Sequence, residues 1–292
     1  MKYWSRNATD YCAPVLAGVV EILICPHCGG DLRENGASLV CSRGHTANIA
    51  RQGYVSLLGS RSGTHTADSA EMLAARDRVL ARGLFQPVAD AIGEKVREAA
   101  LDRVEGAVVD LGTGTGWYLA GILEALPERV GLGIDNSKYA ARRAAKVHPR
   151  AGAVVADIWD EIPVKSGAAA LILDVFSPRN GEEIERIRAE GGSLIVVTPT
   201  GDHLKELIEP FGLISVDPDK EERLERTLGA TTGTSGEARL VEWKMRLSPG
   251  EVRDLIGMGP NAGRIDQEKL DALAGGLPDL SEVTGSVRVW PR

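Results

Sequence analysis

The chain has 292 residues, 43% of them hydrophobic, and a formal net charge of −7 at pH 7. This length is enough for a full domain with a buried core and a smaller module, so we expect two domains. The longest apolar stretch near the start, residues 13–25, is too short to span a bilayer, which argues against a membrane protein. The acidic balance argues against attraction of a polyanion to the whole surface, although residues 1–66 carry six Lys and Arg against four Asp and Glu.

Residues 1–21 form an N-terminal extension by this interpretation, and residues 22–58 contain a pattern typical of zinc sites. The pattern is C-x2-C-x12-C-x3-H, formed by Cys25, Cys28, Cys41 and His45. Three thiolates and one imidazole complete a closed tetrahedral shell, so the pattern predicts one structural Zn2+ in a zinc ribbon. Cys12 lies outside this spacing and leaves no even set for disulfides. This cysteine usage favours a reducing compartment, and we expect a cytoplasmic protein.

A polar linker follows the ribbon, and we assign residues 59–104 to this linker and two helices. The first helix is predicted to begin after Asp68, with Asp68 as its N-cap and Glu71 three residues later, and to end near residue 82. The second helix is predicted over residues 85–101.

Residues 105–292 alternate strand-like and helical patterns, which is typical of a doubly wound, mostly parallel α/β sheet. The strand-like runs are AVVDL (107–111), VGLGID (130–135), GAVVAD (152–157), AALILDVF (169–176) and SLIVVT (193–198). The last third adds RLVEWKMRLS (239–248), a helical segment over 248–258 and EVTGSVRVW (282–290). These segments predict a final antiparallel hairpin with an intervening helix.

A glycine-rich motif stands where the first of these strands turns into a helix. Its residues are Asp110, Leu111, Gly112, Thr113, Gly114, Thr115 and Gly116. Glycines at such a turn let a ligand approach the backbone closely. A dinucleotide fingerprint needs G-x-G-x-x-G, and the third glycine is replaced by Trp117 or Leu119, depending on the register. The motif instead resembles motif I of class I S-adenosylmethionine (SAM) methyltransferases, which have a Rossmann-like domain. By that resemblance Asp110 would orient the loop or bind the methionyl ammonium, and the three glycines would lie beside the methionine part of the cofactor.

Two further carboxylates end the next two strands. Asp135 follows the second strand, where an acidic side chain accepts hydrogen bonds from both ribose hydroxyls. Asp157 follows the third strand, where the resemblance puts a group that faces the adenine amine, with Ile158 beside the ring. An isolated Asp at a strand end is more often a turn or cap residue, so the register with the glycine motif supports the assignment.

Several other segments extend the resemblance over about residues 22–290. They are CPHC (25–28), CSRGHT (41–46), IARQGYVSLL (49–58), DSAEM-x-x-AR (68–76), VFSPRN (175–180) and VVTPTGDHLKEL (196–207). Together they resemble the bacterial 23S rRNA (guanine-N1)-methyltransferases, most of all the branch associated with resistance to tylosin and related macrolides. The resemblance implies a ribbon that contributes to RNA recognition, a SAM-binding domain and a target guanine in a hairpin loop of the ribosomal exit tunnel. It also implies a homodimer, with 23S rRNA or a precursor of the large ribosomal subunit as partner.

Guanine N1 carries a proton, so such an enzyme must position the base and remove this proton. N1 is buried in a duplex, and an unpaired loop guanine is therefore the more accessible substrate. Arg179, after the fourth strand, could hold guanine O6 or a phosphate, and His203 is a candidate proton acceptor by its ordinary pKa. Asp174, where the family more often has an uncharged or basic residue, could act as the base if it is buried. Each of these residues has an alternative interpretation. Arg179 could be solvated, His203 could belong to the capped start of the following helix, and Asp174 could be bonded to backbone amides.

For RNA contact we expect basic and aromatic side chains on the ribbon and on the helix after Asp135. They are Arg33, Arg43, Arg51, Gln52 and Tyr54 on the ribbon, and Arg142, Arg143 and Lys146 on the helix. The more common interpretation of the helical cluster is a solvent-exposed helix face. Two other functions stay open: a small-molecule SAM-dependent methyltransferase, which would not need a ribbon, and a non-enzymatic RNA-binding protein that retained the fold.

Overall fold

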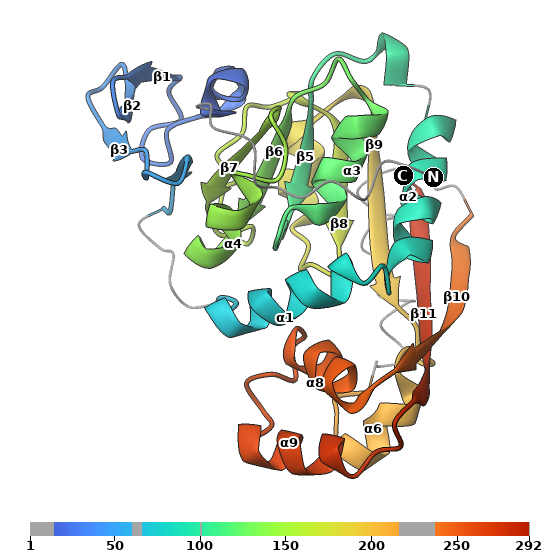
Figure 1. Ribbon diagram of the computed structural model, residues 1–292. Coiled ribbons are helices and arrows are strands. Elements are labelled where there is room, and N and C mark those ends of the chain that lie inside the picture. The colour runs from blue at the N-terminus through green and yellow to red at the C-terminus, as the bar shows by residue number, and fades with distance from the viewer. Residues whose placement is uncertain (1–14, 60–65, 100, 216–236, 292) are drawn as a thin grey trace.

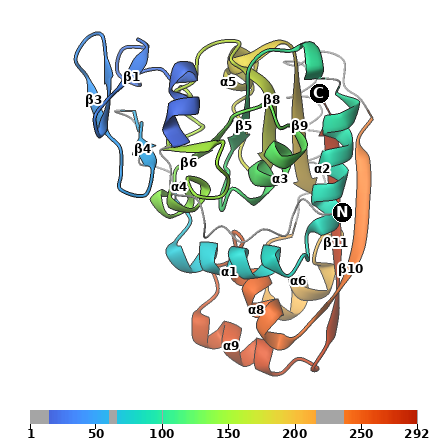
Figure 2. The same ribbon diagram turned by 45° about the horizontal axis from the view of Figure 1, so that its top comes forward.

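The computed structural model describes residues 15–59, 66–99, 101–215 and 237–291. Two sheets organise this part of the chain (Figures 1 and 2). Residues 1–14, with Cys12 and most of the predicted extension, lie outside the described residues.

The smaller sheet is antiparallel and consists of β1 (Leu32–Asn35), β2 (Ser38–Cys41) and β3 (Thr46–Asn48). It lies at one end of the molecule in both ribbon views, beyond β7 in Figure 1 (Figures 1 and 2). The predicted zinc ribbon therefore corresponds to a separate small sheet, which the chain completes before it enters the large one.

The larger sheet has eight strands in the order β10-β11-β9-β8-β5-β6-β7-β4. They are β4 (Tyr54–Ser56), β5 (Ala107–Leu111), β6 (Gly131–Asp135), β7 (Ala151–Val155), β8 (Ala169–Val175), β9 (Arg188–Pro199), β10 (Arg239–Leu247) and β11 (Ser281–Pro291). The strands from β9 to β4 in this order are parallel, whereas β11 and β10 form the antiparallel end. The predicted doubly wound, mostly parallel sheet and its final hairpin are confirmed. β4 comes from the segment assigned to the ribbon, yet it pairs with β7 of the large sheet.

The helices belong to the larger unit. They are α1 (Ala70–Ala81), α2 (Gln86–Glu98), α3 (Trp117–Ala125), α4 (Lys138–Ala144), α5 (Gly181–Ile187), α6 (Lys205–Phe211), α8 (Pro249–Gly257) and α9 (Gln267–Gly275), with short 3-10 helices η1 (Val15–Gly18), η2 (Val20–Ile22) and η3 (Leu101–Arg103). In Figure 1 α1, α6, α8 and α9 lie beyond the carboxyl ends of the parallel strands. No helix among the described residues is long and apolar enough to cross a membrane.

The N-terminus of α1 corrects the predicted cap by one residue. Ser69, not Asp68, is the N-cap, because its hydroxyl accepts a hydrogen bond from the backbone N–H of Met72 at 3.2 Å. Asp68 instead forms an ion pair with Arg76, at 2.8 Å. At the other end of α1, Arg78 donates two hydrogen bonds to the carboxylate of Asp254 on α8, at 2.6 and 2.7 Å. These contacts hold α1 and α8 together across the carboxyl edge of the sheet.

The ribbon and the large sheet share one hydrophobic core. Leu32 and Leu39 of the ribbon are buried in the same cluster as Val109 and Ile134 of the sheet. The stem that precedes the ribbon is also hydrogen-bonded to the loop after β7, since Ile24 N donates to the carbonyl of Pro163 at 3.1 Å. The ribbon is therefore packed onto the larger unit.

Candidate functional site

Four side chains of the ribbon converge on one point. The Sγ atoms of Cys25 and Cys41 each lie 3.5 Å from Nδ1 of His45, and the Sγ atoms of Cys28 and Cys41 are 3.7 Å apart. All four donor atoms lie within 4.8 Å of one another. A tetrahedral zinc with Zn–S of about 2.3 Å and Zn–N of about 2.0 Å has ligand-to-ligand edges of about 3.5 to 3.8 Å. The predicted set therefore fits a closed structural Zn2+ site.

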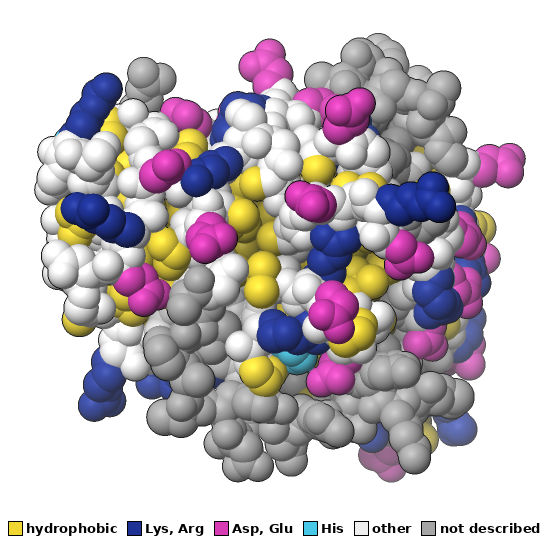
Figure 3. Space-filling model, turned by 90° about the horizontal axis from the view of Figure 1, so that it is seen from above, with side chains coloured by type: hydrophobic (Ala, Val, Ile, Leu, Met, Phe, Trp, Pro, Cys, Tyr) yellow, Lys and Arg dark blue, Asp and Glu magenta, His cyan; other side chains and the backbone are white. Residues whose placement is uncertain are grey.

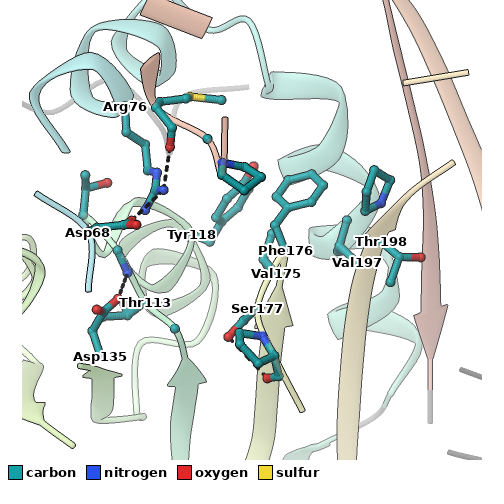
Figure 4. A pocket seen from close by; sticks show the side chains of 18 of the residues that line it. Asp68, Arg76, Thr113, Tyr118, Asp135, Val175, Phe176, Ser177, Val197 and Thr198 are labelled. Atoms are coloured by element: carbon teal, nitrogen blue, oxygen red, sulfur yellow. Dashed lines mark hydrogen bonds and ion pairs between the residues drawn. The ribbon is translucent and has the colours of Figure 1, made fainter. Parts of the chain in front are cut away.

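A cavity of about 1110 Å3 lies at the carboxyl ends of the parallel strands. Its walls come from the segments that follow β5, β6, β7, β8 and β9, and from α1 and α8. Ligands of open α/β sheets bind at this edge. Figure 4 shows a polar side with Asp68, Arg76 and Asp135, and beyond it a more apolar side with Tyr118, Phe176 and Val197.

The glycine motif forms part of the polar side. A Cβ on Gly112 would lie 2.7 Å from Cβ of Ser177, and a Cβ on Gly114 would lie 2.7 Å from Nη1 of Arg76. Both glycines line the cavity, whereas Gly116 does not. A Cβ on Gly116 would lie 3.0 Å from Cα of Ala144, so this glycine lets the start of α3 pack closely against the end of α4. The structure thus brings two of the three predicted glycines to the cavity.

Two buried carboxylates stand beside this loop, at the ends of β5 and β6. Asp110 accepts a hydrogen bond from the Thr113 hydroxyl at 2.7 Å. Burial raises the pKa of Asp110 to about 7; the Thr113 hydroxyl opposes this shift and nearby Asp135 adds to it. Asp135 accepts the backbone N–H of Gly114 at 2.9 Å and of Ser137 at 2.8 Å. Burial also raises the pKa of Asp135, against the effect of these two donors. Each Asp135 oxygen keeps a further lone pair for a ligand hydroxyl.

Asp157 and Ile158 line the same cavity, after β7. Both are buried, and Asp157 accepts the backbone N–H of Trp159 at 3.0 Å. The side chains predicted for the cofactor therefore follow three neighbouring strands, in the sheet order β5, β6, β7.

Arg76 lines the polar side of the cavity and Tyr118 its more apolar side, and sequence reasoning gave Arg76 no binding role. Arg76 pairs with Asp68 and donates to the carbonyl of Met258 at 2.8 Å, so it joins α1 to the end of α8 (Figure 4). The Tyr118 hydroxyl is buried and has no hydrogen-bond partner among the described residues. The sequence feature that could have identified Arg76 is its position in the segment DSAEM-x-x-AR.

Arg179 lines the cavity, and Asp174 lies behind it, fully buried. Nη1 of Arg179 is 4.0 Å from Oδ1 of Asp174. In the described part of the chain, neither that nitrogen nor either Asp174 oxygen has a hydrogen-bond partner. The alternative interpretation, a carboxylate bonded to backbone amides, is therefore wrong. Burial raises the pKa of Asp174 well above its ordinary value, although the charge of Arg179 opposes this shift.

His203 lines the cavity, but its pKa is not the ordinary value that was expected. Burial lowers the pKa of His203 to about 4. Its Nδ1 accepts the backbone N–H of Ser286 at 3.2 Å, so the neutral ring carries its proton on Nε2. This arrangement weakens the case for His203 as the proton acceptor.

The residues predicted for RNA contact are distributed over the surface. Arg33, Arg43 and Arg51 of the ribbon are exposed. On α4, Arg143 forms an ion pair with Asp77 of α1 at 2.7 Å and Arg142 is exposed; Lys146, just after α4, is also exposed. Figure 3, which views the molecule from above, shows basic side chains interspersed with acidic ones on that face. That face carries no continuous basic patch among the described residues.

Comparison with known proteins gives matches over both parts of the chain. Residues 23–62 match a zinc-ribbon family model described as "RlmA, N-terminal". A 23S rRNA (guanine(748)-N(1))-methyltransferase from Streptomyces fradiae is 44% identical over 92% of this chain and 95% of its own length. A Micromonospora griseorubida protein, provisionally named as a 23S rRNA (guanine-N1-)-methyltransferase, is 41% identical over 91% of this chain and 95% of its own. A Bacillus subtilis protein with a similarly provisional name is 34% identical over 63% of this chain and 66% of its own.

Proposed function

Because the chain belongs to the 23S rRNA (guanine-N1)-methyltransferase family, we propose that it transfers the methyl group of SAM to N1 of a guanine in 23S rRNA. The Streptomyces fradiae relative is named for guanine 748, so the corresponding guanine is the first candidate target. The observation that supports this function most is a single cavity that combines the glycine loop and its carboxylates with Arg179. Methylation there would make macrolide resistance a consequence of the activity.

The polar side of the cavity suits SAM. Gly112 and Gly114 leave backbone exposed where a Cβ would collide with neighbours, and the Tyr118 hydroxyl has no partner among the described residues. Asp110 would face the methionyl ammonium and Asp135 the ribose hydroxyls. The adenine amine would meet the third carboxylate, with its ring against the apolar side chain that follows; these residues are Asp157 and Ile158. When bound, SAM supplies an electrophilic methyl group on a sulfonium.

On the acceptor side, Arg179 is assigned to guanine O6. Loss of the N1 proton to solvent water places negative charge on N1 and O6, and a guanidinium at O6 stabilises that charge. Asp174 lies behind Arg179, with its Oδ1 4.0 Å from Nη1, and would help to position the Arg179 side chain. We assign His203 the role of a hydrogen-bond donor in the cavity wall and not that of the proton acceptor. Its Nδ1 already accepts a hydrogen bond, and its pKa is about 4.

The experiment that tests this function is transfer of a labelled methyl group from SAM. Unmodified 23S rRNA, a large-subunit precursor particle and a panel of small amines and phenols would be offered separately. Label in 1-methylguanosine after nuclease digestion of the RNA supports the proposal. Label only in a small molecule would favour the alternative enzyme, and SAM binding without transfer to any acceptor would favour an RNA-binding protein.

Two finer statements follow from the family. A ribosomal RNA substrate would be met in the cytoplasm. A homodimer is expected, and sedimentation of the protein at micromolar concentration with and without the RNA measures it.

A further inference from the structure

Phe176 has a backbone conformation that bulky residues rarely adopt. Its φ is +56°, in the left-handed region, and the described non-glycine residues with positive φ are Phe176 and Leu204. Both line the cavity at the carboxyl edge of the sheet. Strained residues of this kind gather where function requires a side chain in one particular place. The conformation of Phe176 therefore marks its ring as a candidate for contact with a ligand.

The ring of Phe176 is fixed on one side and open on the other. It packs against Phe85 with ring centroids 6.0 Å apart and planes at 89°, and lies 6.1 Å from the ring of His203. Phe85 is 2% exposed and packs in turn against Trp243, whose Nε1 donates to the carbonyl of Leu84 at 2.8 Å. Phe176 itself remains 42% exposed. An aromatic cluster around the buried Phe85 thus supports a partly exposed aromatic ring in the cavity.

The position of this ring separates it from the predicted adenine site. Phe176 follows β8, whereas Asp157 and Ile158 follow β7, and β5 and β6 lie between these two strands in the sheet. The next residue, Ser177, lies against Gly112 of the glycine loop. Figure 4 shows Phe176 beside Val175 and Tyr118, away from Asp68 and Asp135. The ring therefore stands next to the methionine end of the cofactor site, where an acceptor must lie.

We infer that Phe176 is the platform on which the unpaired target guanine stacks, an inference that rests on the proposed function. A flipped purine has a flat π-face that aromatic side chains bind, and a polar edge that needs hydrogen-bond donors. Phe176 offers the face, and Arg179, three residues later in the same loop, offers a donor. The left-handed backbone sets the ring in place before the base arrives, so little side-chain freedom is lost on binding.

Three substitutions of Phe176 separate stacking from folding. Phe176→Gly removes the ring but suits the left-handed backbone, so relief of backbone strain offsets part of the lost packing and the variant should fold. Phe176→Leu keeps apolar bulk without a π-face, and Phe176→Tyr keeps the ring. Loss of one base–aromatic stack corresponds to roughly 5- to 150-fold in binding, so kcat/KM for methylation of 23S rRNA should fall by about that factor in the Gly and Leu variants. The Tyr variant should retain activity within about threefold.

The control substitution is Leu240→Ala, because Leu240 is also an exposed large hydrophobic side chain but does not line the cavity. Leu240→Ala should leave kcat/KM unchanged, and calorimetry should find the same SAM affinity in all variants. A Phe176→Gly or Phe176→Leu variant with the parental kcat/KM would overturn the inference alone. A parallel loss of SAM affinity would also overturn it, since Phe176 would then serve the cofactor. Absence of 1-methylguanosine with the unchanged protein would overturn the proposed function and this inference together.

Discussion

We predict that the buried carboxylate of Asp110 makes the affinity for SAM depend on pH. Its pKa in the free protein is about 7, because burial favours the neutral acid. Charged and polar groups around it include Asp135 from β6, Asp174 from β8 and Tyr118 from α3, with Thr113 as its hydrogen-bond donor. A methionyl ammonium beside Asp110 would favour the ionised carboxylate. Binding is therefore favoured above pH 7 and weakened as the pH falls through 7.

The magnitude follows from the ionised fraction. With a pKa of about 7, Asp110 is roughly 76% ionised at pH 7.5 and roughly 3% ionised at pH 5.5, by simple proton equilibrium. If only the ionised form binds SAM well, Kd should rise about 25-fold between these pH values, or about 2 kcal/mol. Near pH 8 the α-amino group of SAM begins to lose its own proton, so the affinity should pass through a maximum between about pH 7 and 8.

Titration calorimetry from pH 5.5 to 8 measures this dependence. A matched control ligand is 5′-methylthioadenosine, which keeps the adenosine and lacks the ammonium group, so its Kd should change much less. It also reports any contribution from Asp135 at the ribose. The variant Asp110→Asn should bind SAM more weakly and with a flat pH profile. The assignment of Asp110 to the ammonium would be refuted if the Kd for SAM changed by less than twofold over this pH range. It would also be refuted if the Kd of Asp110→Asn depended on pH as steeply as that of the parent protein.

Three further substitutions test other parts of the site. Cys25→Ser removes one thiolate, so zinc content by mass spectrometry should fall and the thermal midpoint should drop, because the ribbon shares its core with the sheet; retained zinc with an unchanged midpoint would contradict the metal site. Gly112→Ala places a Cβ 2.7 Å from Cβ of Ser177 and should weaken SAM binding at least about tenfold. Gly201→Ala, where nothing lies within 4 Å of the new Cβ, is its control. Equal SAM affinity in the two variants would contradict the role of Gly112 in SAM binding. Arg179→Ala should lower kcat for RNA methylation by about 10²–10³-fold, the usual effect of removing a donor to a developing anion, and should leave the SAM affinity unchanged. An unchanged kcat would exclude the contact with O6.

Features that depend on neighbouring residues along the chain could be predicted from the sequence. β5 spans residues 107–111 as the run AVVDL indicated, because a strand buried on both faces is mostly apolar. The zinc ligands could also be found, because metal coordination fixes the spacing within each knuckle. The helix cap was one residue off, since Asp68 and Ser69 are both good cap residues and only tertiary contacts select between them.

Other features depend on residues far away in the chain. Arg76 bonds to the carbonyl of Met258, 182 positions later, and His203 receives its hydrogen bond from Ser286, 83 positions later. No local pattern records such contacts, so the role of Arg76 and the low pKa of His203 required the fold. The same holds for Gly116, whose close neighbour Ala144 belongs to another helix. The strained backbone of Phe176 has no sequence signal either, because nothing in VFSPRN demands a left-handed residue at that point.

The most direct measurement is primer extension on 23S rRNA after incubation with the protein and SAM. A methyl group on guanine N1 blocks Watson–Crick pairing and stops reverse transcriptase. We predict a single stop that requires both protein and SAM, at guanine 748, for which the Streptomyces fradiae relative is named. A full-length extension product from protein with demonstrated SAM binding, on naked rRNA and on the large-subunit precursor alike, would contradict N1 methylation of 23S rRNA.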